Sequence, residues 1–565
     1  MGSILPLYRI GVDVGGTNTD AVILDPNGAL WENRGVVAFH KTSTTSPNVT
    51  NGIESAVRAV IKQSGISLGQ ISSICIGTMH FINAVVEHDA KQLSKVAAIR
   101  LSKSYARDIP PFSDFPPALA KLMNDYCGYV NGGLHIDGSQ ESPVLKDQVI
   151  RSAISLKKRD LTRSSLLEQL PGADVVCSSE VANMGFLERE NASILNASIL
   201  KFAQRTITGF KAAMQRLQLE CPLYLTQNDG TLIDAAAAAR FPIRTFSSGA
   251  TNSMRGAAYL GLSSSQGTQN TSAIVIDIGG TTSDVGVLLP SGYPRQASAF
   301  VTVAGIRINY NMPHVESISL GGGSIIKVNV HGYVTVRPTS VGYQLATKAK
   351  IFQGDILTAT NIAVAHDPSI KIGNSALAKD VSTENITQER RKMKVMLERV
   401  IDIMKTSPDP HPVLLVGGGS AIAPNELDSI STIIRPPFHH VANAVGAAIL
   451  KAGSTVDIIQ ITANQTVADA LEHAKLAAIE AAVAIGVIRG TISITEMGSI
   501  PLQYVEHQIR TLVRVAGDLS TDFATVDDIT SDHLHDEEHK DEAISVESKH
   551  KGCIEDAPKP LDIET

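Results

Sequence analysis

The sequence predicts an α/β fold built from two duplicated lobes, followed by an acidic C-terminal tail that stays disordered. A chain of 565 residues is too long for one hydrophobic core, and an apolar fraction of 43% is typical of a folded protein. Apolar runs of strand length alternate with helical patterns along the body of the chain. One stretch near the N-terminus recurs near the middle, which indicates an internal duplication.

The repeated stretch reads YRIGVDVGGTNTDAVIL at residues 8–24 and AIVIDIGGTTSDVGVL at residues 273–288. Each copy is an apolar run, a Gly-Gly turn and a second apolar run, which predicts a tight β-hairpin. An offset of 264 residues aligns the polar and glycine positions: Asp13 with Asp277, Gly15 and Gly16 with Gly279 and Gly280, Thr17 with Thr281, Thr19 with Ser283, and Asp20 with Asp284.

The composition of these turns indicates anion binding. A glycine pair leaves backbone N–H groups free to point at one anion. Hydroxyl groups add further donors, and four residues are candidates for that role: Thr17, Thr19, Thr281 and Thr282. The carboxylates of Asp13 and Asp277 suit Mg²⁺ held through water, because Mg²⁺ keeps several of its waters. Two facing loops would hold a nucleoside triphosphate; alternatively, each Asp caps its own turn and the threonines only form strand.

Three further segments extend the pattern. Residues 247–261 and 439–450 have small side chains at helical spacing, Asn443 and Gly446 among them, so another helix can approach closely. Residues 413–424 read as a buried strand followed by Gly417, Gly418 and Gly419, a turn that suits a flat ligand such as adenosine. This motif order resembles the actin-like ATPase superfamily, which implies ribonuclease H-like lobes around a nucleotide cleft. A dinucleotide-binding fold is excluded because neither hairpin opens a helix.

The remaining elements follow from local patterns. We expect a helix from about residue 48, a strand, turn and helix over 71–87, an irregular Pro/Gly-rich segment over 105–145, and a long helix over 188–219. Helix is expected again over 459–490 and strands over 491–517. The resulting domains are an N-terminal lobe (1–200), a second lobe (201–519) and the tail (520–565).

The motifs RIGVDVGGTNTD and DIGGTTSDVGVL resemble the two halves of the hydantoinase A/5-oxoprolinase family. Other stretches agree: IGTMHFINAVVEHD, TQNDGTLIDAAAA, MPHVESISLGGGSI, ILTATNIAV and PLQYVEHQIRTLVRVAGDL. The resemblance implies an ATP-using, Mg²⁺-dependent enzyme that opens cyclic amides such as 5-oxoproline or hydantoins, while a related branch carboxylates ketones. It also implies a partner, a hydantoinase B-like or other second subunit.

Asp229 follows an apolar strand, where open α/β sheets place ligands. The family's matching segment faces the substrate, so the resemblance gives Asp229 the role of orienting substrate or water; an ordinary turn Asp is the alternative. Met79, His80 and Asn83 stand where the family usually has hydroxyl side chains, which leaves the identity of the substrate open.

His314 and Glu316 precede three glycines, and alternate residues on a strand share a face, so both can reach one divalent cation. Many family members carry Asp-x-His there, whereas this chain has the two chemical types in swapped order. A second divalent metal at this pair is one interpretation, and a hydrogen-bonded strand end is the other.

Resonance protects the carbonyl group of an amide from attack by water. Phosphoryl transfer from ATP to the amide oxygen would remove that protection. Two other functions stay open: a nucleotide-binding partner or regulatory subunit without lactam chemistry, and a small-molecule kinase. The acidic tail, which replaces a family C-terminal half, favours the first of these alternatives.

Composition narrows the remaining classes. Five scattered cysteines without CxxC spacing indicate a reducing compartment, and the N-terminus lacks a secretory pattern, so we expect a cytoplasmic protein. No run of 18 apolar residues predicts a membrane helix, and no basic patch with aromatics predicts nucleic-acid binding. From residue 518 onward, 15 acidic and 4 basic side chains predict a disordered tail. We expect a homo-oligomer.

Overall fold

The computed structural model describes residues 7–520, apart from 46–47, 103–106, 134–139, 158–173, 183–184, 263–271, 298–299, 329–333 and 503–504. Met1–Thr521 form one compact unit, and the fold below belongs to it. The predicted acidic tail lies outside the described residues. No helix within the described ranges combines the length and apolar character needed to cross a membrane.

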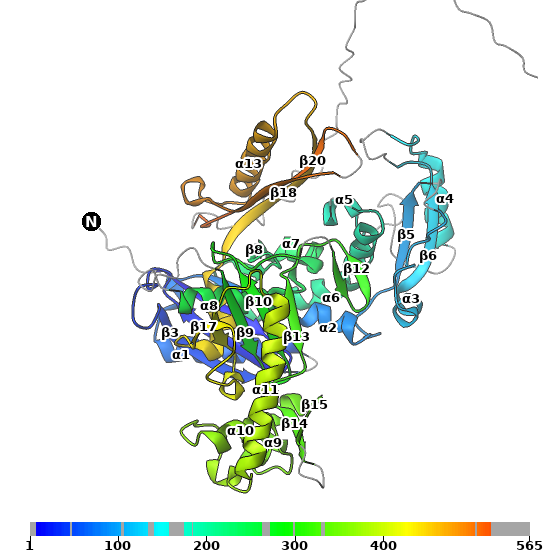
Figure 1. Cartoon of the computed structure of the whole chain (residues 1–565). Helices are drawn as coiled ribbons and strands as arrows, with labels where there is room; N and C mark the ends of the chain where they lie inside the picture. The colour runs from blue at the N-terminus through cyan, green and yellow to red at the C-terminus, as the bar shows by residue number, and fades with distance from the viewer. Residues whose placement is uncertain are drawn as a thin grey trace, which may run out of the picture. The chain divides into compact units, whose positions relative to one another are not determined.

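The larger sheet has nine strands in the order β19-β20-β18-β8-β7-β4-β1-β2-β3, of which β20, β18, β8 and β3 are labelled in Figure 1. The strands are β1 (Tyr8–Val14), β2 (Asn18–Leu24), β3 (Val36–Ser43), β4 (Ile71–Thr78), β7 (Leu223–Thr226), β8 (Thr231–Asp234), β18 (Lys451–Ile461), β19 (Ser493–Pro501) and β20 (Gln508–Gly517). The pair β1–β2 is the predicted first hairpin.

The second sheet has five strands in the order β13-β10-β9-β16-β17. They are β9 (Ala273–Ile278), β10 (Ser283–Leu288), β13 (Val315–Ile318), β16 (His411–Val416) and β17 (Ile430–Ile434). The pair β9–β10 is the predicted second hairpin. Five strands of the larger sheet, β3-β2-β1-β4-β7, repeat this order, with the first three antiparallel and the last two added in parallel.

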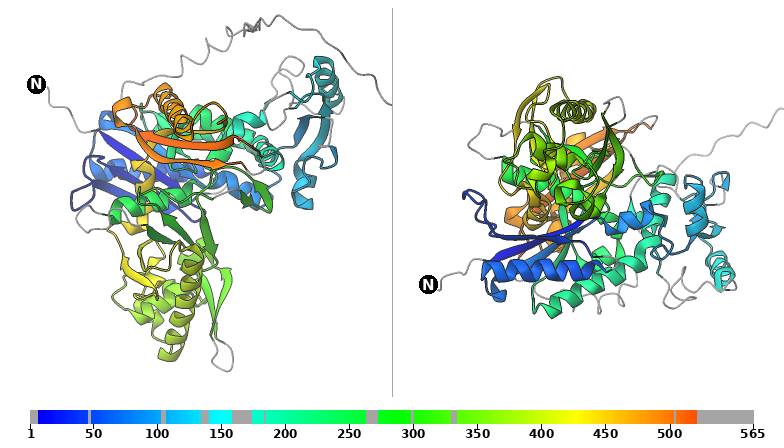
Figure 2. Two further views of the ribbon diagram at one scale, coloured as in Figure 1. Left: turned by 45° about the horizontal axis from the view of Figure 1, so that its top comes forward. Right: turned by 90° about the horizontal axis from the view of Figure 1, so that it is seen from below.

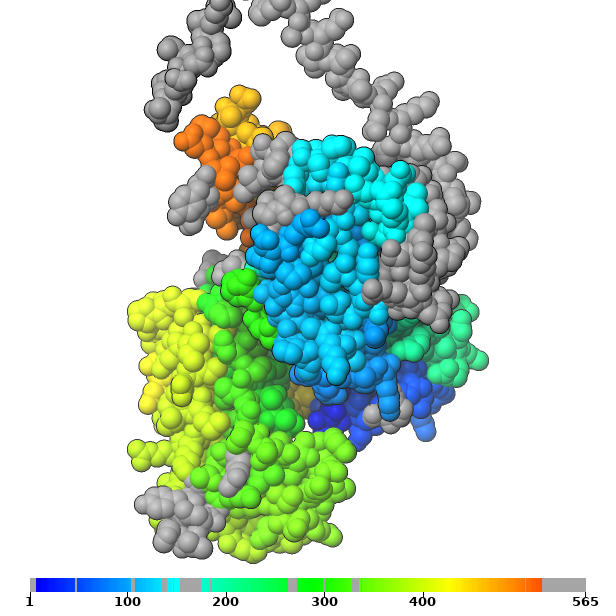
Figure 3. Space-filling view, turned by 90° about the vertical axis from the view of Figure 1, so that its right-hand side faces the viewer, coloured from blue at the N-terminus to red at the C-terminus, as the bar shows by residue number. Residues whose placement is uncertain are grey.

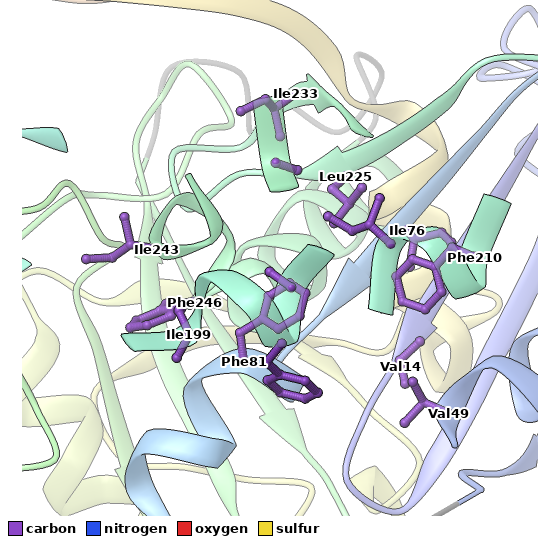
Figure 4. Packing of buried hydrophobic residues seen from close by; sticks show 14 of the residues in the cluster. Val14, Val49, Ile76, Phe81, Ile199, Phe210, Leu225, Ile233, Ile243 and Phe246 are labelled. Carbon is purple, nitrogen blue, oxygen red and sulfur yellow. The ribbon is translucent and has the colours of Figure 1, made fainter. Parts of the chain in front are cut away.

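The first sheet is covered by α1 (Val49–Ser64) and α6 (Leu187–Arg216), which lie side by side in the right view of Figure 2. The Asn48 side chain caps α1 by accepting from the Thr50 N–H, and Gly65 ends it with a φ of 68°. Their buried side chains join those of the strands in one core, part of which is drawn in Figure 4. The long helix predicted over 188–219 is confirmed, and it runs unbroken across the predicted domain boundary at residue 200.

Two helices with small side chains cross in direct contact: α8 (Ser248–Gly261) and α12 (Ala442–Ile449). A Cβ added at Gly256 would lie 1.9 Å from the Ala442 carbonyl oxygen, and one at Gly446 would lie 1.9 Å from the Asn252 carbonyl oxygen. Only glycine allows the two backbones to approach this closely. The predicted close approach of helices at these segments is confirmed.

Three smaller parts complete the unit. Residues Val96–Leu101 (β5) and Asn124–Val130 (β6) pair beside α3 (Pro117–Met123) and α4 (Lys146–Lys157), and this cyan part occupies much of the face in Figure 3. The expectation of an irregular segment over 105–145 is therefore wrong at residues 117–130, which form α3 and β6. The prolines of this segment predict irregular structure, but Pro117 stands at the first position of α3, where a helix does not need its N–H.

The second part is inserted between β13 and β16 of the second sheet and contains β14 (Ser324–Val328), β15 (Val334–Ser340), α9 (Leu345–Lys348), α10 (Ala359–His366) and α11 (Thr383–Met404) (Figure 1). The remaining elements before it are α2 (His80–Val86), α5 (Ser178–Val181), α7 (Ala235–Arg240), β11 (Val301–Val303) and β12 (Ile306–Ile308).

The third part is α13 (Val467–Ala484), which covers β18 and β20. The helix predicted over 459–490 is thus shorter than expected, and residues up to Ile461 belong to a strand. An apolar Ile-rich run fits either structure by pattern alone, and pairing with β20 along ten residues decides for the strand. The strands predicted over 491–517 are confirmed as β19 and β20.

Candidate active site at two glycine hairpins

The turns of the two hairpins have the same geometry. The Gly15 N–H donates to the Asn18 carbonyl at 3.0 Å, and the Gly279 N–H donates to the Thr282 carbonyl at 2.9 Å. The turns also lie close together, since a Cβ added at Gly280 would be 3.9 Å from Thr17 Oγ1. Two turns that are 264 residues apart in the sequence therefore meet tip to tip.

The second turn rests on the glycine run that follows β13. The N–H groups of Gly322 and Gly323 donate to the carbonyl oxygens of Gly279 and Gly280 at 3.0 and 2.7 Å. A Cβ added at Gly321 would lie 2.7 Å from the backbone of Gly280, so a side chain there would displace the turn. These glycines fix the second hairpin by backbone contact alone.

The run Gly417–Gly419, which follows β16, packs on the same hairpin. The Gly419 N–H donates to the Ile278 carbonyl at 2.7 Å. A Cβ added at Gly417 would lie 2.2 Å from Asp277 Oδ1. The predicted turn after a buried strand is confirmed, and its contact with Asp277 brings it to the site; its adenosine role stays a prediction.

Each hairpin carries two carboxylates directly opposite one another. Asp13 pairs in register with Asp20, and Asp277 with Asp284. Opposite residues of an antiparallel pair point to the same face, where like charges are destabilising. Each hairpin therefore places a like-charge pair beside its glycine turn.

Asp13 is held by amide groups from both crossing helices. Asn252 of α8 donates its amide to Oδ1 at 3.4 Å, and Asn443 of α12 donates to Oδ2 at 3.3 Å. Only 6% of Asp13 is exposed, and burial together with the neighbouring charge of Asp20 raises its pKa to about 7. Asn443 thus reaches the site as predicted, whereas Asn252 was not singled out from the sequence.

The carboxylates of the second hairpin are perturbed in the same direction. Burial raises the pKa of Asp277, against the opposing effects of the nearby Ser253 hydroxyl and the charge of Lys41. Burial also raises the pKa of Asp284 to about 6, although Ser317 Oγ donates to its Oδ1 at 2.5 Å. Burial raises the pKa of Asp20 as well, against the charge of Lys41, so all four carboxylates are costly to charge and fit a site that receives a cation.

The donor set fits Mg²⁺ bound through water. The buried Oδ1 atom of Asp20 has no hydrogen-bond partner, so it can accept from a water of a hydrated ion. Within the described ranges, no three His, Cys, Asp or Glu side chains gather closely enough to coordinate a metal directly. An ion beside Asp13 and Asp277 would keep its inner waters.

The candidate threonines differ in their surroundings. Thr19 is fully buried and shares a hydrogen bond of 3.1 Å with Thr44, which donates to the Gly15 carbonyl at 2.8 Å. Thr19 therefore supports the first turn from behind. Thr281 and Thr282 are exposed at the second turn, and their predicted role as anion donors, with that of Thr17, stays a prediction.

Asp229 lies in the turn between β7 and β8. Its Oδ1 accepts from the N–H and the hydroxyl of Thr231 at 3.0 and 2.7 Å, and Gly230 has a φ of 88°. These contacts are those of an ordinary Asx turn, the alternative considered for this residue. Its role toward a substrate stays a prediction.

His314 precedes β13 and Glu316 lies within it, and among the described residues no further His, Cys, Asp or Glu side chain joins the pair closely enough to hold a metal ion. Arg295 Nη2 lies 2.8 Å from His314 Nδ1, and burial with the Arg295 charge lowers the pKa of His314. Glu316 is exposed. A second metal at this pair stays a prediction that metal analysis of His314→Ala checks.

Lys41 of β3 was missed by sequence reasoning. It pairs in register with Asp20, and its Nζ lies 2.8 Å from Asp20 Oδ2. No motif marks the residue, and only the pairing of β2 with β3 brings it to the site.

Comparison with known proteins agrees with this geometry. Models of the hydantoinase/oxoprolinase N-terminal region and of hydantoinase/oxoprolinase match residues 9–163 and 189–367. The caprolactamase subunit alpha of Pseudomonas jessenii is 24% identical over 471 residues, covering 73% of this chain and 65% of that protein. An uncharacterized protein of Methanocaldococcus jannaschii is 22% identical over 518 residues, covering 80% of this chain and 73% of that protein.

Two solved structures share the fold. The nucleotide-free structure of acetone carboxylase has a TM-score of 0.64 at 15% identity, and the ATP-dependent caprolactamase from Pseudomonas jessenii has 0.65 at 17%. Each alignment covers 91% of this chain and 88% of the other. The chain spans 65% of the length of the caprolactamase subunit alpha that it matches. With both family models matched in order along the chain, the protein belongs to the hydantoinase/oxoprolinase family.

Proposed function

We propose that this protein is an ATP-dependent hydrolase that opens a cyclic amide, such as a hydantoin or a 5-oxoproline-like lactam. The observation that carries the proposal is the meeting of two carboxylate-bearing glycine hairpins from equivalent sheets. Similarity to a caprolactamase subunit and to an ATP-dependent caprolactamase supports the same chemistry.

The proposed site belongs to the actin-like ATPase type, with ribonuclease H-like lobes that share one nucleotide. The N–H groups of Gly16 and Gly280 are suited to hold phosphate oxygens from opposite sides, and Gly417–Gly419 to accept the adenosine. Mg²⁺ would supply positive charge to the phosphates. Asp13 and Asp277 would orient the waters of the ion. The positive charge of the ion would in turn lower the raised pKa values of both carboxylates.

The reaction that fits this site begins with attack of the amide oxygen on the terminal phosphorus of ATP. The new O–P bond forms as the bond to the β-phosphate oxygen breaks, and ADP leaves. A first water then adds to the activated carbon, and the ring C–N bond opens as the nitrogen leaves as a protonated amine, which gives an acyl phosphate. A second water hydrolyses the acyl phosphate to the free carboxylate and inorganic phosphate. The chain's contribution is positioning and charge stabilisation.

The test is ADP release with a panel of cyclic amides: 5-oxoproline, hydantoin and caprolactam. We expect at least one ring to stimulate ADP release and to appear as its ring-opened product by mass spectrometry. A stable phosphorylated product would instead indicate a small-molecule kinase. ATP binding without stimulation by any ring would overturn the assignment for the chain alone.

A second candidate function is a nucleotide-binding subunit that needs a partner for lactam chemistry. It is favoured by the similarity to a protein named as a subunit alpha, of which this chain spans 65%. The same panel assayed with and without a hydantoinase B-like protein separates the two. Ring opening that requires the added protein supports the subunit, and ring opening by the chain alone supports the complete enzyme.

A further inference from the structure

Lys41 occupies a position that the duplication itself makes informative. In the first sheet, β3 pairs with β2 so that Lys41 lies opposite Asp20. In the second sheet, β13 pairs with β10 so that Ser317 lies opposite Asp284. The two repeats therefore place a cation in one copy and a neutral hydroxyl in the other, at equivalent positions.

The ammonium group of Lys41 lies where the two sheets meet. Its Nζ is 2.8 Å from Asp20 Oδ2, and a Cβ added at Gly418 of the other sheet's glycine turn would be 3.8 Å away. Its charge also acts on Asp277 of the second hairpin. One third of the Lys41 side chain is exposed (33%), so the group is accessible to a ligand.

The pairing of Lys41 with Asp20 leaves hydrogen-bonding atoms of both groups without a partner in these contacts. Asp20 Oδ1 is buried without a partner, while Lys41 has three N–H donors and one carboxylate acceptor in the contacts above. A lysine is a compact charge on a flexible stem, so it can exchange one anion for another at little steric cost.

We propose that Lys41 is a binding residue for the terminal phosphate of ATP, which it contacts in place of, or together with, Asp20. The inference rests on the proposed use of ATP and adds the residue that distinguishes ATP from ADP. When no nucleotide is bound, Lys41 offsets the charge of Asp20; when the triphosphate enters, the ammonium offsets the charge of its terminal phosphate. Ser317 carries no charge, so the second repeat has no such residue.

The experiment measures binding of the analogue AMPPNP and of ADP, each with Mg²⁺, by calorimetry. We expect Lys41→Met to weaken AMPPNP binding about 10- to 100-fold, the usual effect of losing one charged hydrogen bond, and ADP binding by less than about 3-fold. Lys41→Arg, which keeps the charge, should restore most of the AMPPNP affinity. Lys62→Met, on the exposed side of α1, is the matched control and should change neither.

A purely structural role makes a different prediction. If Lys41 only offsets Asp20, removing both charges in Asp20→Asn/Lys41→Met would return AMPPNP affinity to that of Asp20→Asn alone, and this result would overturn the proposal. We expect the double variant to bind AMPPNP at least 10-fold more weakly than Asp20→Asn. The double variant also has no unpaired buried charge, so it keeps the test valid if Lys41→Met fails to fold.

Equal losses for AMPPNP and ADP would also contradict a contact with the terminal phosphate. The outcome is separate from that of the proposed function, because binding is measured without any cyclic amide. Wild-type protein that binds AMPPNP but opens no ring would refute the hydrolase and leave the Lys41 test intact.

Discussion

The raised pKa of Asp13 means that its charged form lowers the unfolding free energy at neutral pH, and replacing the residue tests this effect. The change is Asp13→Asn, which keeps the shape of the side chain and removes its charge. Because the folded-state pKa is raised from 3.8 to about 7, the native protein binds more protons than the unfolded chain between these values. Stability is therefore present at low pH and is lost as the pH rises through about 4 to 7.

The magnitude follows from the structure. A rise of about 3 pKa units corresponds to about 4 kcal/mol of unfolding free energy above pH 7. Two amides donate to Asp13, from Asn252 and Asn443, and an asparagine accepts only one of them, at a loss of about 1 kcal/mol. The net gain is about 3 kcal/mol at pH 8. For a unit of 521 residues, with an unfolding entropy of roughly 1 kcal/mol/K, this raises the Tm by about 3 °C.

The assay is thermal unfolding of wild type, Asp13→Asn and the control Asp402→Asn, whose residue is exposed on α11, from pH 5 to pH 8 without nucleotide. We expect the variant's advantage to grow with pH and to be small at pH 5, while ATP hydrolysis is lost at every pH. An Asp13→Asn protein that is folded but less stable than wild type at pH 8 would refute the reasoning. An unchanged pH dependence would refute it equally.

Three other changes test neighbouring features. Gly280→Val should abolish ADP release while the protein stays folded. A Cβ at Gly280 would lie 3.9 Å from Thr17 Oγ1, so it fits without a clash but fills the space between the turns. The control Gly490→Val, where a Cβ meets nothing within 4 Å, should retain activity. Gly256→Ala should lower the unfolding free energy by at least about 3 kcal/mol, because its Cβ would lie 1.9 Å from the Ala442 carbonyl oxygen. The control Gly69→Ala, in open space, should have no such effect. Equal denaturation curves for Gly256→Ala and wild type would contradict the helix crossing. Ser317→Ala removes a hydrogen bond that lowers the pKa of Asp284. If this carboxylate acts as its anion, the acid limb of the kcat profile should move to higher pH; an unchanged acid limb would show that the reaction does not depend on its charge.

The sequence was most informative where two stretches repeat one chemical pattern. The aligned Asp, Gly and Thr positions predicted both hairpins, and the small-residue segments predicted the helix crossing at Gly256 and Gly446. These features depend on local geometry: a turn needs glycine, and close helices need small side chains. Local requirements of this kind leave a recognisable trace in one sequence.

Features that arise from pairing between distant segments left no such trace. Asn252 reaches Asp13 from 239 positions away, through the approach of α8 to β1 and β4. Lys41 joins the site only because β3 adds to β2 in a register that nothing near Lys41 specifies. Residues 459–461, the end of β18, were expected to be helical because a short apolar run fits both structures until its partner β20 is known.

A crystal structure of the protein with Mg²⁺ and AMPPNP would show whether the two hairpins share one triphosphate. The account predicts phosphate oxygens within about 3 Å of backbone N–H groups from both turns, Gly15–Thr17 and Gly279–Thr281. A triphosphate that is bound by one hairpin alone, or away from both, would contradict it.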